Sequence, residues 1–266
     1  MAPFDLEQGK ISVRLSEGVY FQLLADVEDF NFKKANGTLN PNAFFNHLLP
    51  NLIAYRIAKR KSLRSYIKKS ILGYVKDNYK NNFLYRMDDL FDFCYFDDNQ
   101  EHYHRETIHF RLNKSNIIQL QDFFNELEKL KEKKTTYLRN LFNEYASMRK
   151  DKRECICFDD EYAILCHAIS KNLSVTCLYK NEKHTIIPVR IDLNYIDGSI
   201  YLLALNTENT NICHAFRLCW LRDLKENPSP IHSNIDNELI KKIEYLIYEY
   251  DYTDKPNIDL TQITSI

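Results

Sequence analysis

The chain is poor in glycine and has no long apolar run. Only 5 of its 266 residues are Gly, and it contains neither a glycine-rich phosphate loop nor the G-x-S-x-G turn of serine hydrolases. No apolar run approaches the roughly 18–20 residues that a membrane span requires, and the N-terminus lacks the apolar core of a signal peptide. We therefore expect a cytoplasmic protein without enzyme activity, cofactor or membrane partner.

The 7 cysteines form no even framework of the kind that disulfide-rich secreted proteins carry. We therefore expect them to be reduced. Cys155, Cys157, Cys166 and His167 lie close together in the sequence. However, they include no C-x-x-C pair, and adjacent residues project about 100° apart on a helix. This spacing predicts no metal site.

Negative charge is absent from one long stretch, because no Asp or Glu occurs between Phe30 and Lys76. Residues 1–153 hold 26 Lys and Arg against 20 Asp and Glu, whereas residues 154–266 hold 10 against 17. The basic stretch also contains Tyr55, Tyr66 and Tyr74. Phosphates attract cations and bases stack on aromatic rings, so the pattern favours a nucleic-acid partner. A solvated helix face is the alternative.

One segment of the first half occurs twice. KISVRL at 10–15 and ETIHFRL at 106–112 align at an offset of 97 residues. After a shorter loop the offset becomes 93, and the aligned pairs include Phe44/Tyr137, Phe45/Leu138, Leu48/Leu141, Leu49/Phe142 and Arg56/Arg149. Each copy, about 10–56 and 106–149, predicts an alternating strand followed by two amphipathic helices. One copy alone cannot bury its strand, so the two are expected to pack together.

Cap residues mark where these helices begin. Ser16 and Asn113 stand in the cap position of the first helix of each copy, and Asn40 with Pro41 begins the next helix of copy one. Pro50 is expected to kink that helix. Residues 57–105 predict a helical connection that ends in an acidic, aromatic segment around 88–98.

The second half predicts short strands after one helix. Acidic residues at 159–161 precede a helix over 162–170. The strand candidates are 173–179, 184–193, 199–205, 212–218 and 220–224, followed by a break at 227–230, a helix over 236–252 and a frayed end. The predicted fold class is α+β. Residues 1–153 form a helical region with a two-stranded ribbon, 154–226 a small five-stranded barrel, and 227–266 a helical extension.

The strand–helix–helix units resemble the ribbon-helix-helix DNA-binding fold. The phrase ISVRLSEGVYFQLL, a Gly-containing turn and an Asn-capped helix carry this resemblance. It implies two antiparallel strands that expose alternate side chains to the major groove. The start of the second helix, at 40–42, would add N–H groups for a phosphate. The candidate nucleic-acid-binding residues are Lys10, Ser12, Arg14, Lys33, Lys34, Asn40, Arg60, Arg64, Thr107, His109 and Arg111.

Residues 159–224 resemble the WYL domain, a small Sm-like or SH3-like barrel. Pro188, the Ile200-Tyr201-Leu202 triplet and Phe216-Arg217-Leu218 carry the resemblance. It implies a ligand-sensing or nucleic-acid-binding module of prokaryotic regulators, often tied to phage defence and CRISPR systems. Cys219 and Trp220 stand where the family usually has Asp-Arg. The candidate ligand-binding residues, for a nucleotide or oligonucleotide, are Tyr179, Arg190, Tyr201, His214 and Arg217.

Three functions are compatible with these features. The first is a non-enzymatic regulator of the WYL type that binds duplex DNA with Arg14 and Arg111. The second is a single-stranded-RNA-binding accessory of a type VI CRISPR effector, because a ribbon-helix-helix region joined to a WYL domain resembles such proteins. The third is a protein–protein adaptor whose helices only dimerise. The sequence leaves open whether the two strands pair within one chain or in a homodimer.

Overall fold

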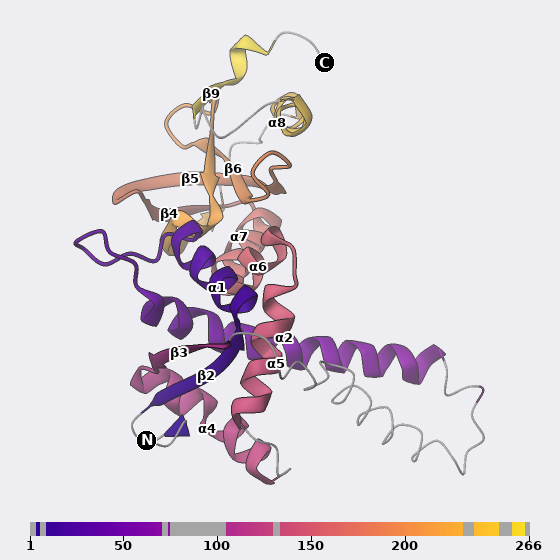
Figure 1. Cartoon of the computed structure of the whole chain (residues 1–266). Coiled ribbons are helices and arrows are strands. Elements are labelled where there is room, and N and C mark those ends of the chain that lie inside the picture. The colour runs from indigo at the N-terminus through magenta and orange to yellow at the C-terminus, as the bar shows by residue number, and fades with distance from the viewer. Residues whose placement is uncertain are drawn as a thin grey trace. The chain divides into compact units, whose positions relative to one another are not determined.

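The structure, a computed structural model, describes residues 4–5, 9–70, 74, 105–129, 134–230, 237–249 and 257–263. It divides into two compact units, Met1–Met148 and Arg149–Ile266 (Figure 1). The described residues form seven α-helices and two antiparallel sheets, which confirms the mixed helix and sheet class. None of the described helices is long and apolar enough to cross a lipid bilayer.

The first unit repeats the predicted order of one strand and two helices. The first copy comprises β2 (Lys10–Ser16), α1 (Glu17–Asp29) and α2 (Pro41–Ser70). The second comprises β3 (Arg105–Arg111), α4 (Lys114–Lys129) and α5 (Lys134–Ala146). The Asn40 side chain accepts a hydrogen bond from Ala43 N at 3.1 Å, and Asn113 accepts one from Asn116 N at 2.8 Å. Both Asn caps are thus confirmed, whereas Ser16 makes no side-chain cap bond.

Strands β2 and β3 pair antiparallel within one chain. Their register places Ser12 opposite His109, Arg14 opposite Thr107 and Lys10 opposite Arg111. A short strand β1 (Phe4–Asp5) pairs with the first two residues of β2, so the sheet order is β1-β2-β3. Strands β2 and β3 together form the ribbon.

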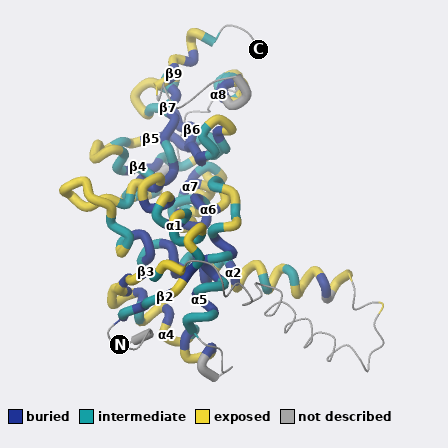
Figure 2. The backbone as a smooth tube through the Cα atoms, in the orientation of Figure 1, coloured by how far each residue is buried: buried dark blue, intermediate teal, exposed yellow. Residues whose placement is uncertain are grey.

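Buried residues alternate with less buried ones along β2 and β3 (Figure 2), so one face of the ribbon packs against the first unit's core. Both copies contribute buried residues to that core. Phe45 of α2 stacks on Phe110 of β3 with ring centroids 4.7 Å apart. The buried apolar residues of the ribbon, α2 and α5 are Ile11, Val13, Leu15, Ile108, Phe110, Phe44, Phe45, Leu48, Leu49, Leu52, Ile53, Ile67, Tyr137, Leu138, Leu141, Phe142 and Tyr145.

Helix α2 is longer than the sequence predicts. It continues through Pro50 to Ser70, and Figure 1 shows its far end projecting away from the ribbon. The first part of the predicted connection at 57–105 is therefore the outer half of α2. Apart from Tyr74 and Arg105, the rest of that connection lies outside the described residues, and so does the acidic segment around 88–98.

The second unit places two helices before a six-stranded antiparallel sheet. The helices are α6 (Lys150–Cys157) and α7 (Asp159–Lys171). The strands are β4 (Leu173–Tyr179), β5 (Glu182–Leu193), β6 (Ile200–Asn206), β7 (Ile212–Arg217), β8 (Leu221–Pro230) and β9 (Asn257–Asp259), in the order β8-β4-β5-β6-β7-β9. Helix α8 (Asn237–Glu249) packs on this sheet through Ile243 and Leu246, which are buried with Leu203 and Leu205 of β6.

The predicted closed barrel is not confirmed. Among the described strands, β8 and β9 are the two edges of the sheet and do not pair with each other. The sheet nevertheless curls strongly. Tyr179 on β4 makes an edge-to-face contact with Phe216 on β7 at 4.9 Å, although β5 and β6 lie between these strands in the sheet order. The 3-10 turn Leu218–Trp220 then joins β7 to β8.

Two predictions for the C-terminal region were wrong. The segment 227–230 does not break the chain, because β8 continues to Pro230 as an edge strand, where prolines are tolerated. The end of the chain is not simply frayed, since β9 pairs with β7.

The segment that contains the predicted boundary at 153/154 is a helix. It forms α6, which lies wholly in the second unit. Glu154 is fully buried there, and its carboxylate accepts hydrogen bonds from Ile200 N at 2.9 Å and Cys219 N at 3.2 Å. Helix α6 is therefore attached to β6 and to the 3-10 turn, and polarity in the sequence concealed this role.

Candidate nucleic-acid interface

On the exposed face of the ribbon neither β2 nor β3 places an acidic residue, and Asp5 of β1 lies opposite Lys10 at one end of it. Alternation along two strands places every second residue on this face, and those residues are Lys10, Ser12, Arg14, Ser16, Arg105, Thr107, His109 and Arg111. Arg14, His109 and Arg111 are exposed, and Lys10, Ser12 and Thr107 are half-buried. The structure thus brings together six of the predicted nucleic-acid-binding residues on one surface.

The centre of this face holds a cross-strand hydrogen bond. Ser12 Oγ lies 2.8 Å from His109 Nδ1. Leu112 N donates to Gly9 O at 2.8 Å, so Gly9 and Leu112 are a hydrogen-bonded pair of the antiparallel ladder. Hydrogen-bonded and non-hydrogen-bonded pairs alternate along such a ladder, so Ser12 and His109, three positions further along, form a pair without backbone hydrogen bonds. Side chains in such pairs lie closest together, which lets a short serine reach the ring.

The outer edges of the ribbon are occupied by side chains of the second helices. On the β3 edge, Asn42 Oδ1 accepts from Arg111 N at 2.7 Å, and Asn46 Nδ2 donates to Arg111 O at 2.8 Å. On the β2 edge, Arg139 Nε donates to Arg14 O at 3.0 Å. These contacts fix the start of α2 beside one end of the exposed face, where helix N–H groups attract anions.

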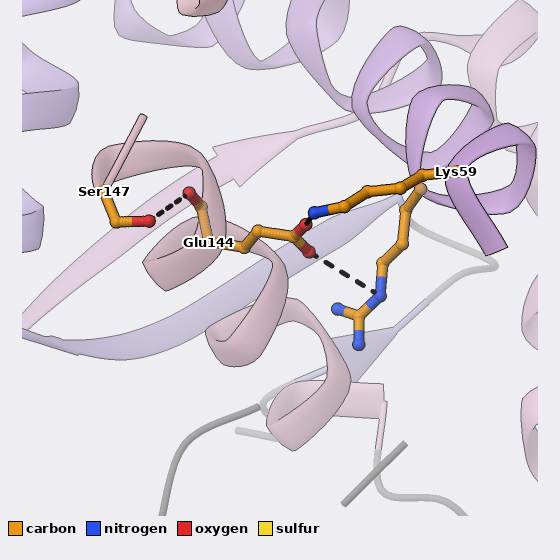
Figure 3. A network of polar contacts seen from close by, with 4 residues as sticks. Lys59, Glu144 and Ser147 are labelled. Carbon is orange, nitrogen blue, oxygen red and sulfur yellow. Dashed lines mark hydrogen bonds and ion pairs between the residues drawn. The ribbon is translucent and has the colours of Figure 1, made fainter. Parts of the chain in front are cut away.

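An ion cluster around the carboxylate of Glu144 joins α2 to α5 (Figure 3). Glu144 is buried and lies 2.7 Å from Lys59 Nζ and 4.0 Å from Arg56 Nε. The Arg56 guanidinium also lies over the Tyr137 ring at 4.7 Å. Two cations of the acid-free stretch are therefore paired within the protein and do not belong to a free positive surface.

The other predicted residues of the first unit lie outside the ribbon. Lys33 and Lys34 are exposed in the turn before α2, and Asn40 is half-buried as its cap. Arg60 is half-buried and Arg64 is exposed on the outer half of α2. None of these five belongs to β2 or β3.

A second cluster of aromatic and cationic side chains lies in the second unit. Tyr179 contacts Phe216, and Trp220 lies 6.0 Å from the Tyr179 ring. Lys180 Nζ lies 4.8 Å from the Trp220 ring centroid, and the Arg217 guanidinium lies 5.7 Å from it. Cations over an indole ring are held by its electron-rich face. The aromatic–cation cluster defined by these five residues contains two of the predicted ligand-binding residues, Tyr179 and Arg217.

The remaining predicted ligand-binding residues have other partners. Arg190 pairs with Asp192 at 2.9 Å and Glu244 at 3.6 Å. The buried Tyr201 hydroxyl donates to Asp197 at 3.0 Å, and His214 Nδ1 lies 2.6 Å from Asn257 Oδ1. Arg190 is thus neutralised by acids on β5 and α8 and does not add positive charge to the cluster.

Arg217 is placed among acidic groups. Burial alone would lower its pKa, but the nearby Cys219, Glu154, Tyr201 and Asp197 outweigh this effect and raise it. Burial also raises the pKa of Glu154, and the Ile200 N–H and the Arg217 charge act in the opposite direction. Arg217 Nε and Nη2 and Trp220 Nε1 are buried without a hydrogen-bond acceptor. Arg217 therefore compensates a buried carboxylate and still holds unused donors.

Sequence reasoning missed several of these residues. Asn42, Asn46 and Arg139 are ordinary helix residues in the sequence, and only the folded register shows that they reach the ribbon backbone. Lys180 follows a strand in a predicted turn, which gave no sign of its contact with Trp220. Among the residues that the structure describes, no group of three His, Cys, Asp or Glu side chains is arranged to hold a metal ion.

Comparisons with known proteins support the fold. No family model matches the chain, and no curated protein matches it. One similar solved structure is described as the crystal structure of a CRISPR Cas-related protein. It matches with a TM-score of 0.64 at 15% sequence identity, over 90% of this chain and 71% of that chain. At this identity the likeness concerns the fold.

Proposed function

We propose that the first unit binds duplex DNA through the exposed face of the ribbon, as a non-enzymatic regulator with a duplicated ribbon-helix-helix region. The observation that carries this proposal is the acid-free face of β2 and β3, with Arg14 and Arg111 exposed on it. A two-stranded ribbon has the width of the major groove, and Arg donates bidentately to guanine. Strand β1 reaches only Lys10 and Ile11, so the rest of the ribbon stays two-stranded.

The test compares two charge-matched double variants of the full chain. Arg14→Ala with Arg111→Ala removes both exposed arginines of the face. Lys183→Ala with Lys241→Ala removes two exposed cations of the second unit that belong to neither candidate surface. We expect the first variant to bind random-sequence duplex DNA about 100-fold more weakly, at about 1–3 kcal/mol per contact. The second variant should bind like the wild type, and both should keep the wild-type Tm. Equal binding by all three proteins would exclude the ribbon as the binding surface.

A second candidate function is binding of single-stranded RNA by the second unit, as a WYL-type accessory in a CRISPR system. The aromatic–cation cluster supports it, because bases stack on aromatic rings while cations attract the phosphates. The likeness to a CRISPR Cas-related protein is consistent with this setting. Titration with random single-stranded RNA at two salt concentrations tests it. The double variant Lys180→Ala with Trp220→Ala should bind RNA more weakly and bind duplex DNA like the wild type. If the wild type binds neither RNA nor duplex DNA, the protein–protein adaptor is favoured.

A further inference from the structure

The two copies in the first unit are related by a twofold axis that crosses the ribbon at a single residue pair. The repeat relates Ser12 to His109, since these positions align at the offset of 97. The strand register also places Ser12 directly opposite His109. A rotation that exchanges the copies therefore exchanges these two residues, so the axis passes between them.

Contacts outside the strands obey the same axis. Asn46 donates to the backbone oxygen of Arg111, and Arg139 donates to that of Arg14. Arg14 aligns with Arg111 at the offset of 97, and Asn46 aligns with Arg139 at the offset of 93. The twofold axis therefore exchanges the two hydrogen bonds, and the symmetry extends from the ribbon into α2 and α5.

The axial pair breaks this symmetry chemically. A ribbon made by two identical chains must place the same residue twice on the axis. Here a serine and a histidine share that place, and their hydrogen bond of 2.8 Å occupies Nδ1 of the imidazole. The ring's Nε2 is left for an external partner, and it comes from one strand only. Arg14 and Arg111, by contrast, lie two positions from the axis on either side.

We infer that the Ser12–His109 pair sets the orientation in which the protein binds duplex DNA. This inference rests on the proposed function of the ribbon. The favoured duplex has two guanine contacts related by the axis, one for Arg14 and one for Arg111. Between them lies a central step that differs from its own reverse complement, because His109 contacts it from one side. Ser12 is a positioning residue that fixes the ring, and His109 is the specificity-determining residue.

The test selects duplexes from a random-sequence library with the full-length wild type and with two variants. Wild type should select inverted guanines around an asymmetric centre and should bind that duplex about tenfold more tightly than one whose central step is its own reverse complement. His109→Ser places a serine on both sides of the axis. It should keep the inverted guanines, select a centre that is its own reverse complement, and lose the tenfold preference.

Ser12→Ala is the second variant, because it keeps the imidazole and removes only the group that holds it. We expect it to select the wild-type sequence with a preference of less than tenfold for the correct centre. If wild type and His109→Ser select the same asymmetric centre, the inference is overturned while the proposed function stands. If wild type selects no duplex, the proposed function itself fails. Thermal unfolding of each variant shows that a changed selection does not come from a changed fold.

Discussion

The two units use arginine in opposite ways. Arg14 is exposed on the face of the ribbon on which β2 and β3 place no carboxylate. Thr107 lies opposite it, and the Ser12–His109 pair lies next along the same face. Arg217 of the second unit is half-buried, and its charge acts on the buried Glu154. An exposed cation without an acid partner remains available to an external anion, whereas a buried one mainly offsets the cost of a buried carboxylate. The residue type alone therefore does not identify a binding residue, because the charges around it decide its role.

The largest expected effect is a difference in stability between two arginine variants. Arg217→Ala removes a positive charge that acts on the buried Glu154, and it should lower the free energy of unfolding by about 2–3 kcal/mol. Arg14→Ala should change it by less than about 0.5 kcal/mol, as is usual for exposed positions. Urea unfolding of the full chain measures both. Equal effects would remove the contrast between the two units.

Replacing the carboxylate of Glu154 tests the other member of this charged pair of residues. Glu154→Gln keeps the shape but places an amide N–H₂ against one of the two backbone donors, Ile200 N or Cys219 N. The loss of one buried hydrogen bond should cost about 1–3 kcal/mol. Glu208→Gln, at an exposed position, is the matched control. A stabilised Glu154→Gln protein would mean that the carboxylate is not required to attach α6.

A single acid on the ribbon should interfere with its proposed function. Thr107 lies opposite Arg14, so Thr107→Glu would place a carboxylate beside that guanidinium. We expect duplex binding to weaken about tenfold, since one lost contact corresponds to about 1–3 kcal/mol. Thr107→Gln controls for size. Anisotropy titration at low salt measures the difference, and unchanged binding by the Glu variant would argue against this face.

The smallest effect concerns the pH dependence of the second unit. Burial lowers the pKa of His214, which outweighs the opposing hydrogen bond to Asn257. The folded state then binds this proton less readily than the unfolded state, so stability should fall as pH drops through about 6.5. The ring is half exposed, and the loss should stay below about 1 kcal/mol. His214→Gln should show a smaller decrease in Tm between pH 7.5 and 5.5 than the wild type does.

The sequence predicts elements better than it predicts their partners. Periodicity located the ribbon strands, and asparagine caps located α2 and α4, because these signals are local. The aligned repeat also predicted that Ile11 and Phe110 are buried in one core. In contrast, the strand at 220–224 was predicted to stop before a break at 227–230, since only the sheet order shows that β8 is an edge strand in which prolines are tolerated.

The candidate sites divide in the same way. Alternation placed Arg14, His109 and Arg111 together on one face, as the register shows. It could not assign Arg56 and Lys59 to Glu144, because that residue is distant in the sequence and on another helix. Charges whose partners come from distant elements are therefore the part of a site that a sequence does not supply.

Lysine footprinting of the unmodified full chain tests the central claim most directly. Lys10 belongs to the ribbon face, and Lys180 belongs to the aromatic–cation cluster of the second unit. Acetylation of each lysine, measured by mass spectrometry with and without saturating duplex DNA, compares the two units in one experiment. We predict that duplex protects Lys10 and leaves Lys180 as reactive as in the free protein. Protection of Lys180 with an unprotected Lys10 would contradict the assignment of duplex binding to the ribbon.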